Sequence, residues 1–228
     1  MMNIILIAPP AAGKGTQSKL ISQRYNIPHI STGDLLRDET SSGSDAGKRL
    51  KAIMDSGALI SDDKIVNLLR ARISKVDCNN GYVLDGYPRN VEQALIYDDL
   101  LLDSRKNVGV VIYLDIDKDL ALKRTLTRLI CSSCFASYNA AIEGLKPRNE
   151  GFCDKCGHPL RLRGEDNIET FPVVFGNFVN DISSVLKYYN DKGLLRVVKI
   201  LENDTIEDVF QKIKIVIKIM KIIKQLYI

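Results

Sequence analysis

The chain has 228 residues, with 32 basic and 28 acidic side chains and a formal net charge of +4. This length can bury a full hydrophobic core, as one domain with insertions or as two small domains. The net charge is too small to indicate nucleic-acid binding by itself. No cationic stretch precedes the first apolar run, and no run of 18 apolar residues is free of charge. We therefore expect neither a signal peptide nor a membrane span.

A phosphate-binding loop is predicted at the start of the chain. Residues 3–8 form an apolar run typical of a short buried strand. Gly-Lys-Gly-Thr follows at 13–16, and a helical pattern opens at Gln17. In this order, the N–H groups of the turn and of the helix N-terminus can point at a phosphate, and Lys14 adds a positive charge.

The loop departs from the usual pattern at three positions. Ala8 stands where the pattern has glycine, and Pro10 and Ala11 stand where a loop usually needs freedom to adopt positive φ. Taken alone, the run at 13–16 is also compatible with a glycine helix cap beside a surface lysine. Its place between a strand and a helix favours phosphate binding.

Alternating strand and helix patterns follow. Further strands are predicted at 82–85, 108–114 and 195–201, and helices at about 62–75, 90–102, 117–128 and 204–225. This alternation predicts an α/β fold, with a parallel sheet wrapped by helices. Ligands of such sheets bind at the carboxyl ends of the strands, where Ala8, Asp85 and Asp115 are expected. We expect the active centre there.

Two segments interrupt the alternation. Residues 31–60 are rich in Ser, Gly and Asp and predict a small helical insertion, and residues 129–164 predict a small irregular module with four cysteines. The second segment holds Cys131-Ser-Ser-Cys134 and Cys153-Asp-Lys-Cys156, separated by 18 residues.

Two such Cys-x-x-Cys pairs are typical of one tetrahedral zinc ion. Four sulfur ligands leave no position for water, so the zinc is expected to be structural. Two disulfides or free thiols are the alternatives, but a metal suits a reducing cytoplasm better. His158 is expected to be a surface turn residue and Cys78 a small apolar filler.

Two shorter motifs carry charge at predicted strand ends. In Asp-Gly-Tyr-Pro-Arg at 85–89, the acid can hold the water shell of a metal and Arg89 can bind a phosphate. Ser-Thr-Gly-Asp-Leu-Leu-Arg at 31–37 places Arg37 one turn inside a helix. Each motif alone is equally compatible with an ordinary turn or helix cap.

With all these motifs in this order, the chain resembles an adenylate kinase of the long bacterial type, with a zinc-binding lid, from residue 3 to about 217. The resemblance implies the P-loop nucleotide kinase fold, with a parallel five-stranded sheet wrapped by helices. It implies three parts: a core at 1–30, 61–126 and 165–228, a helical insertion for the nucleoside monophosphate (NMP) at 31–60, and a zinc lid at 127–164.

The resemblance also implies roles for individual residues. ATP would be held by Ala11, Ala12, Gly13, Lys14, Gly15, Thr16 and Arg124. AMP would be held by Thr32, Arg37, Leu59, Ile60, Ser61, Gly86, Arg89, Gln93 and Arg163. The transferring phosphoryl group would meet Lys14, Arg89, Arg124, Arg128 and Arg163. Zinc would be bound by Cys131, Cys134, Cys153 and Cys156, and Asp85 would organise magnesium through water.

The implied activity is magnesium-dependent phosphoryl transfer from ATP to AMP, giving two ADP, by a cytoplasmic monomer. The AMP phosphate is already ionised, so the reaction needs cations and magnesium rather than a general base. It also needs water to be excluded, which two insertions closing over the core would do.

The chain departs from the family in the segment after the lid. Family members carry an arginine eleven residues after Arg163, where this chain has Val174, and Pro172 forbids an uninterrupted helix through that point. Position 174 either faces the phosphates or packs into the core. Arg161 either substitutes for the missing charge or is merely solvated. We expect a weakened enzyme.

Alternatives to this kinase remain at the level of sequence. They are a nucleotide-binding relative without activity, a kinase for another nucleoside monophosphate, and a zinc module that binds nucleic acid or a partner. Thr32 and the long zinc lid favour AMP, and the cysteine pairs lack the basic and aromatic surroundings of a nucleic-acid site. The Ile/Lys-rich helix at 211–228 either packs on the core with a frayed tail or contacts an anionic membrane surface.

Overall fold

A five-stranded parallel sheet forms the centre of the molecule, as predicted. The structure is a computed structural model that describes residues 2–55, 60–162 and 166–226. The strand order is β2-β3-β1-β4-β8. The bounds are Met2–Ile7 for β1, His29–Ser31 for β2, Gly81–Asp85 for β3, Val108–Ile116 for β4 and Leu195–Ile200 for β8. Patterns in the sequence placed four of these strands. β2 has three residues and is too short to show a period.

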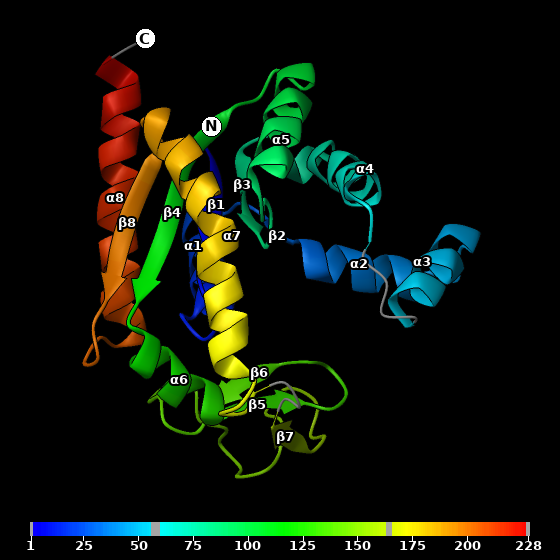
Figure 1. Cartoon of the computed structure of the whole chain (residues 1–228), viewed down its shortest axis with the longest axis vertical. Coiled ribbons are helices and arrows are strands. Elements are labelled where there is room, and N and C mark those ends of the chain that lie inside the picture. Colours follow the sequence, from blue (N-terminus) through cyan, green and yellow to red (C-terminus); the bar gives the residue numbers. More distant parts are fainter. Residues whose placement is uncertain (1, 56–59, 163–165, 227–228) are drawn as a thin grey trace.

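Helices cover both faces of this sheet (Figure 1). They are α1 (Lys14–Tyr25), α4 (Asp62–Ile73), α5 (Val91–Asp103), α6 (Lys118–Leu126), α7 (Phe171–Asp191) and α8 (Ile206–Leu226). Side chains of a strand alternate between the two faces, so β1 sends Ile4 and Leu6 towards α1 and α8. Its Ile5 and Ile7 pack with α4, α5 and α7. Burial on both faces explains the unbroken apolar run of β1.

Two excursions leave this core on either side of the sheet's carboxyl edge (Figure 1). The first holds α2 (Thr32–Ser41) and α3 (Asp45–Asp55). The second is not wholly irregular, as the sequence had suggested, because it contains a three-stranded antiparallel sheet in the order β6-β5-β7. Its strands are β5 (Arg128–Cys131), β6 (Ser137–Asn139) and β7 (Leu160–Leu162). Strands of three or four residues leave too short a pattern to recognise. We call residues 128–162 the lid.

Pro172 lies in the first turn of α7. Proline is tolerated there because the first N–H groups of a helix have no partner inside it. The break predicted at this proline is therefore the start of the helix. Phe171 and Phe175 are buried on either side of it and fix the rotation of α7 on the core.

α8 packs against the core from Val209 to Ile223. Val209, Ile213, Ile217 and Met220 are buried on one side of the helix. The opposite side exposes Ile219 and the lysines at 218 and 221. Of the two interpretations of this helix, packing on the core is thus observed, and membrane contact stays an untested expectation. Among the described residues, no helix is both long and apolar enough to cross a membrane.

Matched substitutions on α8 test this packing. Ile213 is fully buried, whereas 46% of Ile219 is exposed. We expect Ile213→Ala to lower the free energy of unfolding by about 2–5 kcal/mol, because it removes buried methyl groups and leaves a cavity. Ile219→Ala should change it by less than about 0.5 kcal/mol. Urea unfolding followed by circular dichroism measures both, and equal losses would contradict the observed docking of the helix.

Candidate functional site

A cleft of about 870 Å³ opens at the carboxyl ends of β1 and β3, bordered by α7 and the lid. Ala8 and Asp85 line it, as expected for this edge of the sheet. Asp115 also lies at the carboxyl end of its strand, as expected, since it is the last residue but one of β4. It pairs in register with Lys199 of β8 and does not line the cleft.

The loop between β1 and α1 forms one wall of the cleft. All of residues 11–16 line it, and Gly13 takes φ +85° as the N-terminal cap of α1. Ala11 takes φ +61°, a left-handed conformation that costs an alanine about 1–2 kcal/mol. The unpartnered N–H groups of the first turn of α1 are thus available to an anion in the cleft.

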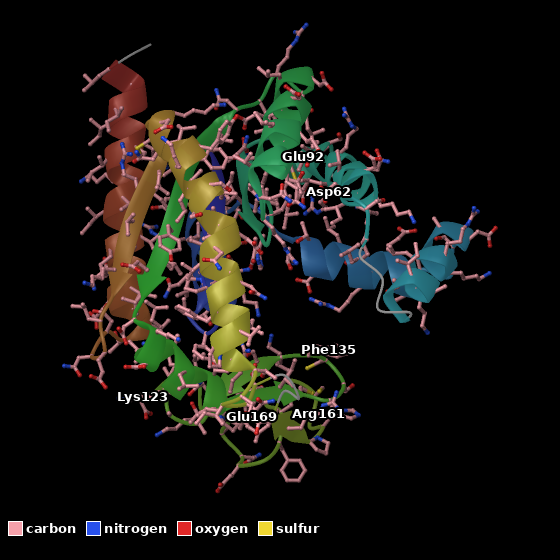
Figure 2. The ribbon with its side chains drawn as sticks, viewed as in Figure 1. Asp62, Glu92, Lys123, Phe135, Arg161 and Glu169 are labelled. Atoms are coloured by element: carbon pink, nitrogen blue, oxygen red, sulfur yellow. The ribbon has the colours of Figure 1, made fainter. Side chains whose placement is uncertain are left out.

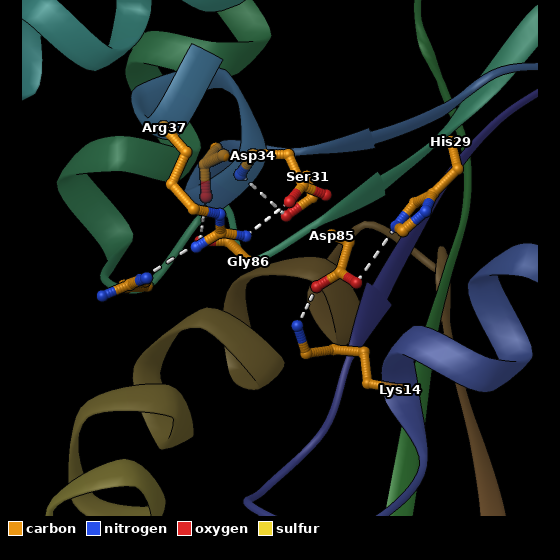
Figure 3. A network of polar contacts seen from close by, with 9 residues as sticks. Lys14, His29, Ser31, Asp34, Arg37, Asp85 and Gly86 are labelled. Atoms are coloured by element: carbon orange, nitrogen blue, oxygen red, sulfur yellow. Dashed lines mark hydrogen bonds and ion pairs between the residues drawn. The ribbon is translucent and has the colours of Figure 1, made fainter. Parts of the chain in front are cut away.

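Lys14, Asp85 and His29 form a chain of contacts, of which Lys14 and Asp85 line the cleft (Figure 3). The Lys14 ammonium pairs with one carboxylate oxygen of Asp85. His29 Nε2 lies 3.1 Å from the other oxygen. Burial and the positive charge of Arg89 lower the pKa of Lys14 to about 8, and burial lowers the pKa of His29. A poorly hydrated ammonium gains more from a phosphate than an exposed one does.

The turn after β3 ties together four residues that the resemblance assigned to AMP. Thr32 Oγ1 donates to the carbonyl oxygen of Gly86 at 3.2 Å, and Arg89 Nε donates to the same oxygen at 3.1 Å. The N–H of Arg89 donates to Gln93 Oε1 at 2.8 Å. Gly86 takes φ +85°, and a Cβ there would lie 2.8 Å from Thr32 Oγ1, so only glycine fits.

Of the other residues expected near AMP, some line the cleft and others do not. Arg37 lines the cleft and pairs with Asp34. Ser61 precedes α4, whose first residue, Asp62, accepts a hydrogen bond from Gln93 Nε2 at 2.7 Å. Thr32, Ile60, Ser61 and Gln93 do not line the cleft themselves. Leu59 and Arg163 lie outside the described residues.

Two arginines reach the cleft from α6 and the lid. Arg124 lies in the last turn of α6, where burial lowers its pKa and the carboxylate of Asp204 opposes that shift. Arg128 begins β5 and binds Asp166 through two hydrogen bonds, with Nε 2.6 Å from Oδ2. Asp166 is almost fully buried. The sequence had given no hint of this ion pair, because its partners are 38 residues apart.

Position 174 faces the cleft rather than the core. Val174 lines the cleft and is 47% exposed, while Phe171 and Phe175 take the buried positions of this turn. Of the two alternatives for Val174, packing into the core is therefore wrong, and the side chain lines the cleft. This wall of the cleft carries no cation, because its α7 lining residues are apolar apart from Asn177 and Asp181.

The four paired cysteines gather in the lid. Their sulfur atoms all lie within 4.8 Å of one another. Cys131 Sγ is 3.4 Å from Cys156 Sγ, and Cys134 Sγ is 3.5 Å from Cys153 Sγ. Tetrahedral bonds of about 2.3 Å hold sulfurs roughly 3.8 Å apart, so a metal ion fits this group. All are free thiols rather than disulfides. His158 is exposed and outside the group, as expected.

The geometry agrees with the comparisons with known proteins. The family model described as Adenylate kinase matches residues 6–194. The chain belongs to the adenylate kinase family. It is 40% identical to an adenylate kinase of Clostridioides difficile over 212 residues, which cover 93% of this chain and 96% of that protein. It is 38% identical to one of Geobacillus sp. over 213 residues, with 93% and 97% covered, and 41% identical to one of Treponema denticola over 194 residues, with 85% and 90% covered.

Family membership makes the chain an enzyme, a nucleoside monophosphate kinase that works by AMP-dependent phosphoryl transfer. It also agrees with the arrangement of the structure, in which the loop at 11–16 and the cysteine-bearing lid border one cleft.

Substitution of single cysteines tests the metal group in this adenylate kinase lid. We expect one metal ion per chain, and Cys153→Ser should abolish stoichiometric binding because three ligands cannot close the tetrahedron. Chelation should increase hydrogen exchange in the lid while the five-stranded sheet stays protected. Cys78→Ser is the control, because Cys78 is buried in the core away from the lid. Elemental analysis measures the metal, and a metal-free protein purified without chelators would contradict the assignment.

Proposed function

We propose that this enzyme transfers the terminal phosphoryl group of ATP to AMP, with magnesium, and releases two molecules of ADP. One observation carries the proposal: the loop at 11–16, Arg89, Arg124 and Arg128 surround a single cleft. Phosphoryl transfer depends on placing cations around charge that spreads over the equatorial oxygens of the transferring group. The lysine and the arginines that line this cleft could supply those cations.

The chain's own residues would act by binding and by neutralising charge. A phosphate oxygen of AMP forms a bond to the terminal phosphorus of ATP, and the bond to the bridging oxygen breaks, with its electron pair leaving on ADP. The attacking oxygen is already ionised, so no side chain has to remove a proton. Lys14 would exchange its contact with Asp85 for the phosphates. Bound magnesium would neutralise phosphate charge, with Asp85 holding its water shell.

The ends of the cleft would hold different nucleotides. ATP would lie on the loop at 11–16 with Arg124 beside it. AMP would lie between Arg37 and the turn at 86–89, with Thr32, Gln93 and residues 59–61 around it. The hydrogen bonds that join Thr32, Gly86, Arg89 and Gln93 support this assignment, because they fix the turn before any ligand arrives.

We also propose that the lid metal is zinc and that its role is structural, because four thiolates are the ligands zinc prefers and leave no open position. The division into a core at 1–30, 61–126 and 165–228, an AMP-binding insertion at 31–60 and a lid at 127–164 belongs to the same proposal. The helices α2 and α3 and the short lid sheet support it, since both leave the core at the edge that carries the cleft (Figure 1).

A catalytically silent nucleotide-binding relative is the competing function. The observation that favours it is Val174, which presents an apolar side chain to the cleft where a cation would assist transfer.

The decisive assay mixes the metal-loaded protein with ATP, magnesium and each nucleoside monophosphate in turn. We expect two ADP to form for each AMP consumed, and chromatography of the nucleotides measures both. Lys14→Ala should lower kcat at least a hundredfold, because it removes a charge from the transferring phosphates. Lys187→Ala is the control, since Lys187 is exposed on α7 and pairs with Asp191 of the same helix. Absence of AMP-dependent ATP consumption in the unaltered protein would leave the silent relative as the better description.

A new cation on α7 tests the competing function directly. Val174→Arg should raise kcat severalfold, because the guanidinium would enter the cleft from a half-exposed position. The melting temperature should stay unchanged, since no buried contact is lost. Val173→Arg is the matched control, because Val173 is 60% exposed and does not line the cleft. A lower melting temperature without a gain in rate would show that position 174 serves packing instead.

A further inference from the structure

The lid sheet has one face directed at the cleft. Ile130 of β5 pairs in register with Ser137 of β6 and with Arg161 of β7. Residues directly opposite each other in antiparallel strands have side chains on the same face. Ile130 and Ser137 both line the cleft. Arg161 therefore lies on the same face of the lid sheet as Ile130 and Ser137, beside the residues that line the cleft rather than among them.

The other face of this sheet is occupied by the lid's own small core. Leu129 and Cys131 alternate with Arg128 and Ile130 along β5, and they pack in one cluster with Tyr138. Leu160, the neighbour of Arg161 on β7, packs against the same cluster. The alternation thus assigns Arg161 to the cleft face from two directions, through its partner across the sheet and through its neighbour along the strand.

Among the described residues, the Arg161 side chain has no partner, unlike the side chains of Arg128 and Lys146. Arg128, on the same face, is held by Asp166 through two hydrogen bonds. Lys146 pairs with Glu143. Arg161 is exposed, and its guanidinium forms no ion pair or hydrogen bond with any described residue. Figure 2 shows its side chain extending from the lid. Its guanidinium is available to a ligand without the loss of an internal contact.

The wall of the cleft that α7 forms carries no positive side chain that could serve in place of Arg161. The side chains that α7 contributes there include Val174, Phe178 and Asp181, and none of them is positive. Phosphates bound on the loop at 11–16 can therefore gain further positive charge from the lid but not from α7.

We propose that Arg161 contacts the phosphate chain of ATP and supplies the positive charge that α7 lacks. The planar fork of a guanidinium can donate two parallel hydrogen bonds to phosphate oxygens, which suits it to this role better than lysine. The inference rests on the proposed function in naming ATP as the ligand. It adds a substrate-binding residue to the cleft.

Three variants of the metal-loaded protein test the proposal. Arg161→Ala should raise the Kd for ATP at least tenfold in isothermal titration calorimetry, and should lower kcat/KM for ATP by ten- to a hundredfold. KM for AMP should change less than twofold. The Kd for ATP of Arg161→Lys should lie between those of the unaltered protein and Arg161→Ala, because lysine keeps the charge but lacks the planar fork of the guanidinium. Arg148→Ala is the matched control: it removes an exposed lid arginine that lies outside the lid sheet, away from the face that carries Ile130 and Ser137, and should leave the Kd for ATP unchanged.

Metal content and melting temperature of each variant exclude a folding defect. Equal ATP affinity in Arg161→Ala and the unaltered protein would overturn the proposal, and so would equal losses in Arg161→Ala and Arg148→Ala. The titration also separates this proposal from the proposed function. An unaltered protein that binds ATP but does not use AMP would refute the kinase reaction, and a selective loss of ATP binding in Arg161→Ala would still support the contact.

Discussion

Cations that are to receive phosphates must be held close together while no phosphate is present, and their mutual repulsion then opposes folding. In this chain each of three cleft cations is held by a carboxylate. Asp85 holds Lys14, Asp34 holds Arg37 and Asp166 holds Arg128. The burial of Asp85 and Asp166 makes the first and third pairs the stronger constraints. A bound nucleotide would take over these cations, so the ion pairs keep the empty cleft in the arrangement that phosphates need.

The parallel sheet is what brings the carboxylate of Asp85 to Lys14. β1 and β3 pair in register from Met2 with Gly81 to Leu6 with Asp85. The loop after β1 therefore starts beside the last residue of β3. Shifting this register by one residue would turn Asp85 to the other face of the sheet. Apolar side chains on both faces of β1 and β3 hold the two strands in the core and, through their pairing, fix the distance between the loop at 11–16 and Asp85.

Features that depend on neighbouring residues could be predicted from the sequence, and features that depend on distant pairs could not. The loop at 13–16, the cysteine pairs and the buried strands each carry a local pattern, and the structure brings all of them to the expected places. β2 and the lid strands are too short for a period to show. His29 and Asp166 contact the site through partners 56 and 38 residues away, and a single sequence carries no signal for such contacts.

The place of Val174 could be predicted from the sequence only in part. The sequence showed that the position is apolar and that Pro172 starts or breaks a helix, but the direction of the side chain depended on the rotation of α7. Burial of Phe171 and Phe175 sets that rotation and leaves Val174 in the cleft. The cleft therefore has one apolar wall on α7 and one cationic face on the lid. A cation on the lid face stays hydrated while the cleft is empty, so its desolvation is required only when a phosphate is there to compensate for it. This lets the fold leave Arg161 without a partner among the described residues, whereas the half-buried Lys14 has Asp85 as its partner while the cleft is empty.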